Sequence, residues 1–421
     1  MDFLTTPAAA PLPATPPGTA RPLAWVAALG TISAAGAGLA ALRAALFDTK
    51  REFLSTTDGL CAHALAAGVV DEAQLAPGAA PRTARLIDAC LAQMPELPEL
   101  VARTGPARSA VVLGATTSGM PEVEAAMRVR AQTGALAKDF SIRALNLNEP
   151  ARHAAARLGI TGPVYTISNA CASGAMAVIS GVRLLAAGLA DLVLAGGVDS
   201  LSAFTVTGFD ALGVLGKDPA RPFAASRRGI NLGEGGALLV LTREPLPGSL
   251  AAVTGFGATC DAHHISAPEP EGAGVRRAMQ LALESAHLAP DDIDLVSAHG
   301  TGTVQNDAAE ARALRAVFGS AVPVASYKRI TGHTLAGAGA LQAALAAAHF
   351  LDNPGGALAP NASDVAADPG LNINVINRSQ DEKSVLRLGR PVRHILTNAF
   401  AFGGSNACVI YSRCPAGETA P

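Results

Sequence analysis

Short apolar runs that lead into a glycine- or serine-rich loop and then into an alanine-rich stretch recur along this chain. Three examples are residues 109–113 before Gly-Ala-Thr-Thr-Ser-Gly, residues 164–167 before Ser-Asn-Ala-Cys, and residues 191–195 before Gly-Gly. Short apolar runs bounded by turn residues are typical of strands buried on both faces. The alternation with helical stretches therefore predicts an α/β fold in which helices cover a sheet.

A second series of the same kind follows a Pro/Gly break at residues 245–248, with strands expected at 251–258 and 293–297 and a helix at 274–287. The run Val111-Val-Leu-Gly-Ala-Thr-Thr-Ser-Gly is similar to Leu295-Val-Ser-Ala-His-Gly-Thr-Gly-Thr. This similarity favours an internal duplication, although strand-then-glycine-loop patterns are common in α/β proteins.

Composition excludes several classes of protein. The 421 residues carry 32 basic and 34 acidic side chains, a net charge of −2, so the chain lacks the basic field that captures nucleic acid. Hydrophobic residues make up 49% and aromatic residues only 4%, which excludes disorder for the bulk of the chain and favours close packing through alanine and glycine. The proline-rich residues 1–21 are expected to form a mobile tail.

The six cysteines show no CxxC pair, so neither a disulfide framework nor a zinc site is indicated, and a reducing cytoplasm fits best. The apolar stretch 23–47 follows a Pro/Ala-rich segment rather than a basic one and is interrupted by glycines and Arg43. We therefore expect neither an export signal nor a membrane span.

One cysteine has a distinctive context. Cys171 follows a predicted strand and a tight turn, and it precedes a helix expected to run to about residue 187. The unpaired N–H groups and positive dipole at a helix N-terminus favour a thiolate and can hold an oxyanion. The alternative is a core cysteine that behaves as a small hydrophobe. That ordinary interpretation is kept for the cysteines without this context: Cys61, Cys90, Cys260, Cys408 and Cys414.

Two histidines lie in glycine loops. His299 follows a predicted strand in Ser-Ala-His-Gly-Thr-Gly-Thr, and His333 precedes an alanine-rich helix in Gly-His-Thr-Leu-Ala-Gly. Catalytic groups are often held on such loops, although a lone histidine is more often structural. His263 and His264 stay undecided. The histidines interpreted as structural are His63, His153, His287, His349 and His394.

The loops Gly233-Glu-Gly-Gly and Gly337-Ala-Gly match neither a P-loop nor a dinucleotide fingerprint, so no nucleotide is predicted. Ordered motifs along the chain instead resemble the β-ketoacyl-[acyl-carrier-protein] synthases of the elongating Cys-His-His type, from residue 22 to residue 412. These motifs are Asn-Ala-Cys171-Ala-Ser-Gly, Arg221-Pro-Phe, Gly233-Glu-Gly-Gly, Asp261-Ala-His-His-Ile-Ser-Ala-Pro, His299-Gly-Thr-Gly-Thr, Lys328 five residues before His333, and Asn398-Ala-Phe-Ala-Phe-Gly-Gly-Ser-Asn.

The resemblance implies the thiolase fold, an α/β architecture in which two similar halves form five α-β-α-β-α layers. It implies a first half at residues 22–248 with the nucleophilic cysteine and a second at 249–413 with the two histidines, between tails at 1–21 and 414–421. It also implies a homodimer, or a heterodimer with a homologous subunit, that works with acyl carrier protein.

The implied reaction is a decarboxylative condensation. An acyl chain moves from carrier-protein phosphopantetheine to the Cys171 thiolate, available near neutral pH, and malonyl carrier protein then loses CO₂. His299 and His333 would bind the enolate oxygen through neutral N–H groups, and the backbone N–H groups of Cys171 and Phe402 would bind the thioester oxyanion. No cofactor beyond the carrier's phosphopantetheine is implied.

The resemblance also assigns supporting roles. Lys328 would hold the charge balance of the site with Asp307 and Glu310 as partners, and Thr301 and Thr303 would line the phosphopantetheine tunnel. Phe402 would gate the acyl pocket. Phe209 and Phe400 would contact substrate, with ordinary core packing as the alternative for a phenylalanine.

Three departures from the family pattern stand out. Gln342 replaces the acidic residue common nine positions after the second histidine, so Lys328 should be anchored differently. Ala401 replaces the glycine before Phe402, which should stiffen that loop. Ala224 stands where Asp often follows Arg-Pro-Phe. Together they favour a dedicated polyene or polyketide pathway over housekeeping fatty-acid elongation.

Two other functions share part of this pattern. A thiolase-fold enzyme acting on coenzyme A thioesters would share the cysteine but would not normally combine the His299 loop with the segment from Lys328 to His333. A non-catalytic chain-length-factor subunit would typically lack the cysteine, so Cys171 argues against it.

Overall fold

The computed structural model describes residues 21–48, 50–78, 80–138, 140–377 and 385–414. The predicted tails at 1–21 and 414–421 therefore lie, except for Arg21 and Cys414, outside the described residues. One large sheet runs through the molecule in the order β11-β10-β14-β15-β9-β1-β8-β7-β5-β6. Its strands are β1 (Ala24–Ser33), β5 (Ser109–Gly114), β6 (Val164–Ile167), β7 (Leu192–Asp199), β8 (Gly235–Thr242), β9 (Ala251–Cys260), β10 (Leu295–Ser297), β11 (Val324–Ala325), β14 (His394–Phe400) and β15 (Ser405–Ser412).

The strand order repeats between the two ends of this sheet. In one half β5 is parallel to β6 and β7, and β8 is antiparallel to both β7 and β1. In the other half β10 is parallel to β11 and β14, and β15 is antiparallel to both β14 and β9. The similar runs found in the sequence lie on β5 and β10, which hold the same position in their halves. The two similar halves are thus confirmed, while the proposed boundary at 248/249 stays a prediction.

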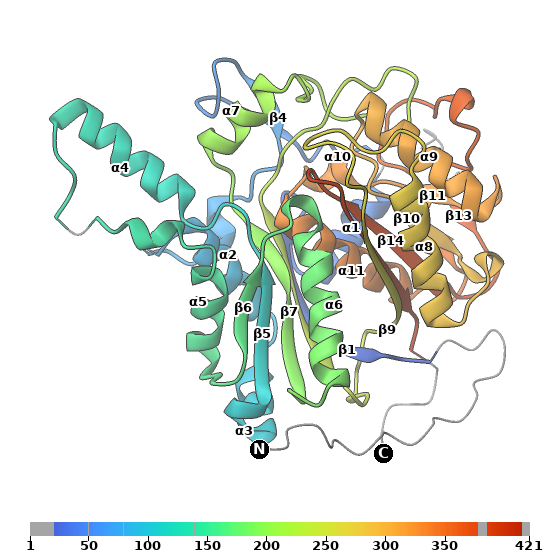
Figure 1. Cartoon of the computed structure of the whole chain (residues 1–421), viewed down its shortest axis with the longest axis horizontal. Coiled ribbons are helices and arrows are strands. Elements are labelled where there is room, and N and C mark those ends of the chain that lie inside the picture. Colours follow the sequence, from blue (N-terminus) through green and yellow to red (C-terminus); the bar gives the residue numbers. More distant parts are fainter. Residues whose placement is uncertain (1–20, 49, 79, 139, 378–384, 415–421) are drawn as a thin grey trace.

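Helices cover both faces of each half, and two of them lie between the halves, which are joined through the pairing of β1 with β9 (Figure 1). On the outer face of the first half lie α2 (Arg82–Leu91) and α5 (Glu149–Leu158), and on the outer face of the second lie α8 (Ala273–Ala286) and α9 (Val304–Phe318). Between the halves lie α6 (Ser173–Ala186) and α11 (Ala336–Phe350), which pack against each other and against strands of both halves. This alternation confirms the five-layered thiolase-type architecture.

Small residues make the central layer possible. Helix α11 is apolar all round and almost wholly buried, as expected for a helix enclosed between two sheets. Its partner α6 carries Gly174, where an added Cβ would come within 2.5 Å of the Ala336 carbonyl oxygen. The surplus of alanine and glycine thus lets the two helices approach through their backbones.

The remaining helices and strands complete the fold. The apolar stretch 23–47 forms β1 and α1 (Leu39–Phe47), and no described helix is long and apolar enough to cross a membrane. In Figure 1, α4 (Met120–Thr133) projects from the body and α7 (Ala203–Ala211) lies near β4. The other helices are α3 (Leu97–Thr104) and α10 (Lys328–Thr331), and the other strands are β2 (Gly36–Ala37), β3 (Ser55–Thr57), β4 (Leu65–Ala67), β12 (Ala357–Leu358) and β13 (Leu386–Arg387).

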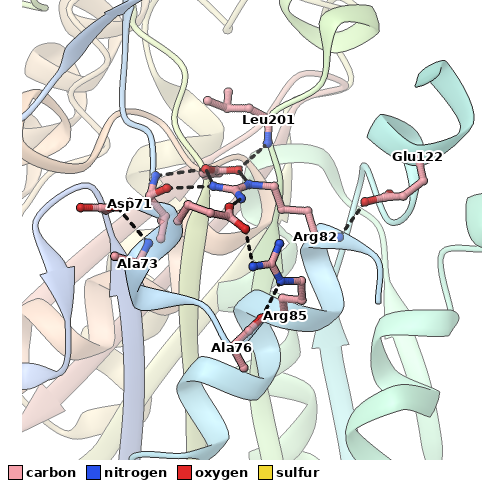
Figure 2. A network of polar contacts seen from close by, with 10 residues as sticks. Asp71, Ala73, Ala76, Arg82, Arg85, Glu122 and Leu201 are labelled. Atoms are coloured by element: carbon pink, nitrogen blue, oxygen red, sulfur yellow. Dashed lines mark hydrogen bonds and ion pairs between the residues drawn. The ribbon is translucent and has the colours of Figure 1, made fainter. Parts of the chain in front are cut away.

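The Gly233-Glu-Gly-Gly loop has a structural role in this frame. Buried Glu234 accepts two hydrogen bonds from Arg82 of α2, at 2.8 and 2.6 Å, and also binds the backbone N–H groups of Val70 and Leu201. Figure 2 shows this network around Arg82. The ion pair fastens α2 and the segment that follows β4 to the start of β8, because a bidentate Arg–carboxylate pair fixes both partners in orientation.

Candidate active site

Cys171 lies in a tight turn between β6 and α6. The turn is a single 3₁₀ turn, Ala170–Ala172, and Ala170 adopts the left-handed conformation at φ 45°. Ser173 stabilises it, since its hydroxyl accepts from Asn169 N–H at 2.8 Å and donates to the Ala170 carbonyl at 2.6 Å. The chain thereby presents the cysteine at the start of α6, with only 6% of its surface exposed.

The environment of the Cys171 sulfur differs from the expectation of a thiolate near neutral pH. Burial raises the pKa of the thiol to about 12, and this outweighs the opposite effects of the Lys328 charge and of hydrogen bonds from the backbone N–H groups of Cys171 and Phe402. The resting group is therefore a thiol, because a helix terminus does not compensate for removal of water from the charged form.

The loop carrying His299 is held by two buried acidic side chains of α9. Glu310 accepts from the backbone N–H groups of His299 and Gly300, at 2.8 and 2.7 Å, and from Asn398 Nδ2 at 2.9 Å. Asp307 accepts from Gly302 N–H at 3.2 Å and from Phe223 N–H at 2.7 Å. These bonds fix the His299 loop where β10 ends.

Lys328 hydrogen-bonds to a backbone carbonyl group, while its predicted partners Asp307 and Glu310 act on it through their charge. Its buried ammonium donates to the His299 carbonyl oxygen and lies 3.5 Å from His299 Nδ1. Neither Asp307 nor Glu310 is within ion-pair distance of the ammonium, and both carboxylates accept hydrogen bonds from backbone N–H groups of the His299 loop. Burial lowers the pKa of Lys328 to about 8, with Glu310, Cys171 and Asp307 acting at longer range to raise it.

His333 faces His299 across the site. The two rings are 5.4 Å apart between centroids and nearly perpendicular, at 83°. Both side chains are buried, and burial together with the Lys328 charge lowers the pKa of each well below 6.5, so both imidazoles are neutral at neutral pH. Within the described part of the chain, neither ring nitrogen of His333 has a hydrogen-bond partner. An unpartnered buried polar group of this kind is costly and is suited to binding a ligand atom.

Gln342 hydrogen-bonds to the ends of β10 and β14, whereas the Lys328 ammonium hydrogen-bonds to His299. Its Nε2 donates to the carbonyl oxygens of Ala298 at 3.1 Å and Asn398 at 3.4 Å, and its Oε1 accepts from the Ser297 hydroxyl. An amide satisfies this position because it both donates and accepts, whereas a carboxylate would place negative charge against two carbonyl oxygens. The hydrogen-bond partners around Gln342 therefore suit a glutamine better than the acidic residue common in the family.

The predicted substrate contacts surround one cavity of about 450 Å³ that also reaches Cys171, His299 and His333. Phe209 of α7 stacks on Phe402, with centroids 5.5 Å apart and planes at 18°, while Phe400 lies 5.4 Å from the His299 ring. The hydroxyls of Thr301 and Thr303, 2.9 Å apart, also line the cavity. Every predicted catalytic or substrate-binding side chain except Lys328 borders this space.

Asp199, at the end of β7, is a residue of this region that no sequence motif indicated. This fully buried carboxylate accepts the N–H and hydroxyl groups of both Thr116 and Thr117, at 2.5 to 3.0 Å, and the Ala336 N–H at the start of α11, at 3.0 Å. It therefore ties the first half to the helix that follows His333. The available signal was an acidic residue ending a strand of otherwise apolar residues.

Comparison with known proteins agrees with this geometry. Residues 89–245 match the model of the β-ketoacyl synthase N-terminal domain and residues 250–353 that of the C-terminal domain, together more than half of the chain. A solved structure of a ketosynthase in complex with its chain length factor, from Xenorhabdus doucetiae, is similar at a TM-score of 0.81 and 32% identity, covering 96% of this chain and 100% of that one.

Two curated proteins are also similar. Nodulation protein E of Rhizobium leguminosarum bv. trifolii is 37% identical over 270 residues, 62% of this chain and 64% of that protein. The 3-oxoacyl-[acyl-carrier-protein] synthase 2 of Staphylococcus aureus is 32% identical over 273 residues, 61% of this chain and 63% of that protein. The matched region thus spans just under two thirds of each of these relatives.

Proposed function

Because this chain belongs to the β-ketoacyl synthase family, we propose that it condenses an acyl thioester held on Cys171 with malonyl-acyl carrier protein. The product is a 3-oxoacyl-acyl carrier protein, and CO₂ is released. The observation that carries the proposal is the meeting of Cys171 with two neutral histidines around one cavity, His333 having both ring nitrogens unpartnered among the described residues.

The first step transfers the acyl group. Sulfur of Cys171 attacks the carbonyl carbon of the phosphopantetheine thioester, and the backbone N–H groups of Cys171 and Phe402 hold the resulting oxyanion. The carbonyl carbon then releases the phosphopantetheine sulfur, which takes up the proton lost by the cysteine. The charge of Lys328 lowers the cost of forming the thiolate in this buried site.

The second step forms the carbon–carbon bond. The malonyl group loses CO₂, and the electron pair of the broken bond becomes an enolate whose oxygen accepts hydrogen bonds from His299 and His333. The enolate carbon attacks the acyl carbon on Cys171, the carbon–sulfur bond breaks to release the Cys171 thiolate, and the thiolate takes up a proton from solvent to restore the thiol. Neutral histidines suit this role because an N–H group that keeps its proton stabilises the enolate without protonating it.

The remaining assignments rest on family membership and the shape of the cavity. Phosphopantetheine would pass Thr301 and Thr303, and the acyl chain would lie beyond Phe402, near Phe209 and Phe400. The substrates would stay on acyl carrier protein without a further cofactor, in cytoplasmic type II fatty-acid, polyene or polyketide synthesis. The chain would act as a homodimer or beside a homologous subunit, as the ketosynthase of Xenorhabdus doucetiae does with its chain length factor.

Reconstitution tests the proposal. The purified protein, given an acyl carrier protein charged with an acyl group and a second one charged with malonyl, should form a 3-oxoacyl carrier protein detected by mass spectrometry, with release of CO₂. Malonyl and acyl coenzyme A replace the carrier substrates in a parallel reaction. Faster condensation of the coenzyme A pair would favour the coenzyme A alternative, and no condensation with any pair in a panel of chain lengths and candidate partner subunits would contradict the proposal.

A further inference from the structure

Three metal-ligating side chains meet outside the active site, where the loop between β3 and β4 reaches α7. Cys61 and His63 lie on the loop and Asp210 lies on α7. The thiol sulfur, an imidazole nitrogen and a carboxylate oxygen lie within 4.8 Å of one another. We propose that this cluster, Cys61, His63 and Asp210, is a zinc site that fastens the β3–β4 loop to α7.

The spacing of the cluster fits a tetrahedral ion after small side-chain movements. His63 Nε2 lies 3.6 Å from Asp210 Oδ1. Two ligands that each bind zinc at about 2.0 Å are roughly 3.3 Å apart in a tetrahedral site. The imidazole and carboxylate side chains are 38% and 33% exposed, so an ion can reach them and water can supply the fourth ligand.

The donor set selects among metals. A thiolate is a soft ligand that suits zinc, whereas magnesium and calcium require oxygen ligands. The Cys61 thiolate and the Asp210 carboxylate together carry two negative charges, which a divalent ion neutralises. Without metal the Cys61 thiol donates to the His63 carbonyl oxygen, at 3.1 Å, a weak bond that a zinc–sulfur bond readily replaces.

The site joins two segments that are far apart in the sequence. Besides the His63–Asp210 contact, a 3.3 Å hydrogen bond from the Thr207 hydroxyl to the Leu60 carbonyl oxygen links them across 147 residues. Leu60 and Cys61 also contact the apolar cluster that contains Cys171 and borders Phe209. A bound ion would therefore fix the position of α7, which lines the active-site cavity through Phe209.

Zinc binding can be measured apart from catalysis. The full-length protein carrying Cys171→Ala, which removes the sulfur of the active site as a rival ligand, is freed of metal and titrated with Zn²⁺ against a chromophoric chelator. We expect one equivalent to bind, and Cys61→Ser or Asp210→Asn to lower the affinity at least about 100-fold. Bound Co²⁺ should give a thiolate charge-transfer band that Cys61→Ser removes.

Hydrogen exchange then tests the fastening role. Zinc should slow exchange in peptides covering residues 58–64 and 203–211, and Cys61→Ser should remove this protection. Cys260→Ser is the matched control, since this exposed cysteine belongs to no such cluster in the described ranges, and it should bind zinc like its parent. Equal zinc affinity in the Cys61→Ser variant, or binding without protection of either segment, would overturn the proposal.

Discussion

The loops after β5 and β10 occupy the same place in their halves, yet they use their polar groups differently. After β5, the N–H and hydroxyl groups of Thr116 and Thr117 all bind Asp199, and the Ser118 hydroxyl binds the carbonyl oxygens of Ala144 and Asn146. After β10, the backbone of the loop is equally well bound by Glu310 and Asp307, but its histidine ring faces the cavity.

The difference continues in the next loop of each half. The loop after β6 presents Cys171, and the equivalent loop after β11 leads through Lys328 to His333. In the proposed reaction, one duplicated frame would thus supply the nucleophile from its first copy and the hydrogen-bond donors from its second. Buried carboxylates whose oxygens all accept hydrogen bonds fix the backbone of these loops. The His333 ring, which has no hydrogen-bond partner among the described residues, is left to bind a ligand.

The largest expected effect comes from removing the group that only the first half supplies. Cys171→Ala should abolish condensation and acyl-enzyme formation, since no other cysteine borders the cavity. Mass spectrometry of the protein after incubation with acyl carrier protein measures the adduct. An acyl group retained on another cysteine would show that the first half does not supply the nucleophile.

The next effect concerns the donors of the second half. His333→Ala or His299→Ala should lower malonyl decarboxylation on the order of 10²–10³-fold, with a smaller loss of acyl transfer, because only the enolate depends on the imidazoles. Release of labelled CO₂ and labelling of Cys171 measure the two steps separately. Equal loss of both steps would contradict the division between the halves.

Since burial and Lys328 hold both histidine pKa values well below 6.5, the wild-type rate should show no loss from histidine protonation as the pH falls to about 6.

A third prediction tests the charge that connects the halves. Lys328→Met should slow alkylation of Cys171 by iodoacetamide roughly tenfold at neutral pH, because the lost cation no longer favours the thiolate. Lys328 is charged below its pKa of about 8 and loses its charge above it. The wild-type advantage over the variant should therefore shrink as the pH rises through about 8. An advantage that is independent of pH would assign the effect to packing instead.

Removing the Asp199 contacts that hold the loop after β5 should lower the stability of the protein. Asp199→Asn turns an amide group toward N–H donors in a fully buried site, which should lower the free energy of unfolding by about 1–3 kcal/mol. Denaturant unfolding measures this loss, and alkylation of Cys171 in the folded variant should stay within a few-fold of wild type. Thr133→Val, at an exposed hydroxyl on α4, is a control expected to change stability little. A loss of alkylation without a loss of stability would give Asp199 a chemical role.

The smallest effect is expected at the gate. Ala401→Gly should broaden the range of acyl-chain lengths accepted, because glycine relieves the backbone restriction beside Phe402, while the following Gly403 and Gly404 already adopt positive φ. Rates with acyl carrier proteins of increasing chain length, in both forms, measure the range. Superimposed profiles would make Ala401 a packing substitution only.

The sequence predicts the layers and the cavity lining better than the chemical state of the groups there. Buried strands and alanine-rich helices follow from local pattern, and the motif order predicts that Cys171, His299 and His333 converge, as the structure places them. The protonated Cys171 thiol and the carbonyl partner of Lys328 could not be predicted, since both depend on burial and on loop geometry. Asp210 is far from Cys61 in sequence, so spacing alone gave no sign of their cluster. The catalytic roles themselves stay predictions.

The position of β1 has a consequence for how the chain folds during synthesis. This strand is completed by residue 33, but its long antiparallel partner, β8, ends at residue 242, and β9, which it meets through only three residue pairs, ends at residue 260. Pairing so distant in sequence is slow, because a long loop must close before the contact stabilises it. Until then an apolar strand, paired with β2 at Ile32 and Ser33, has both edges largely open, the condition under which nascent chains aggregate and chaperones bind.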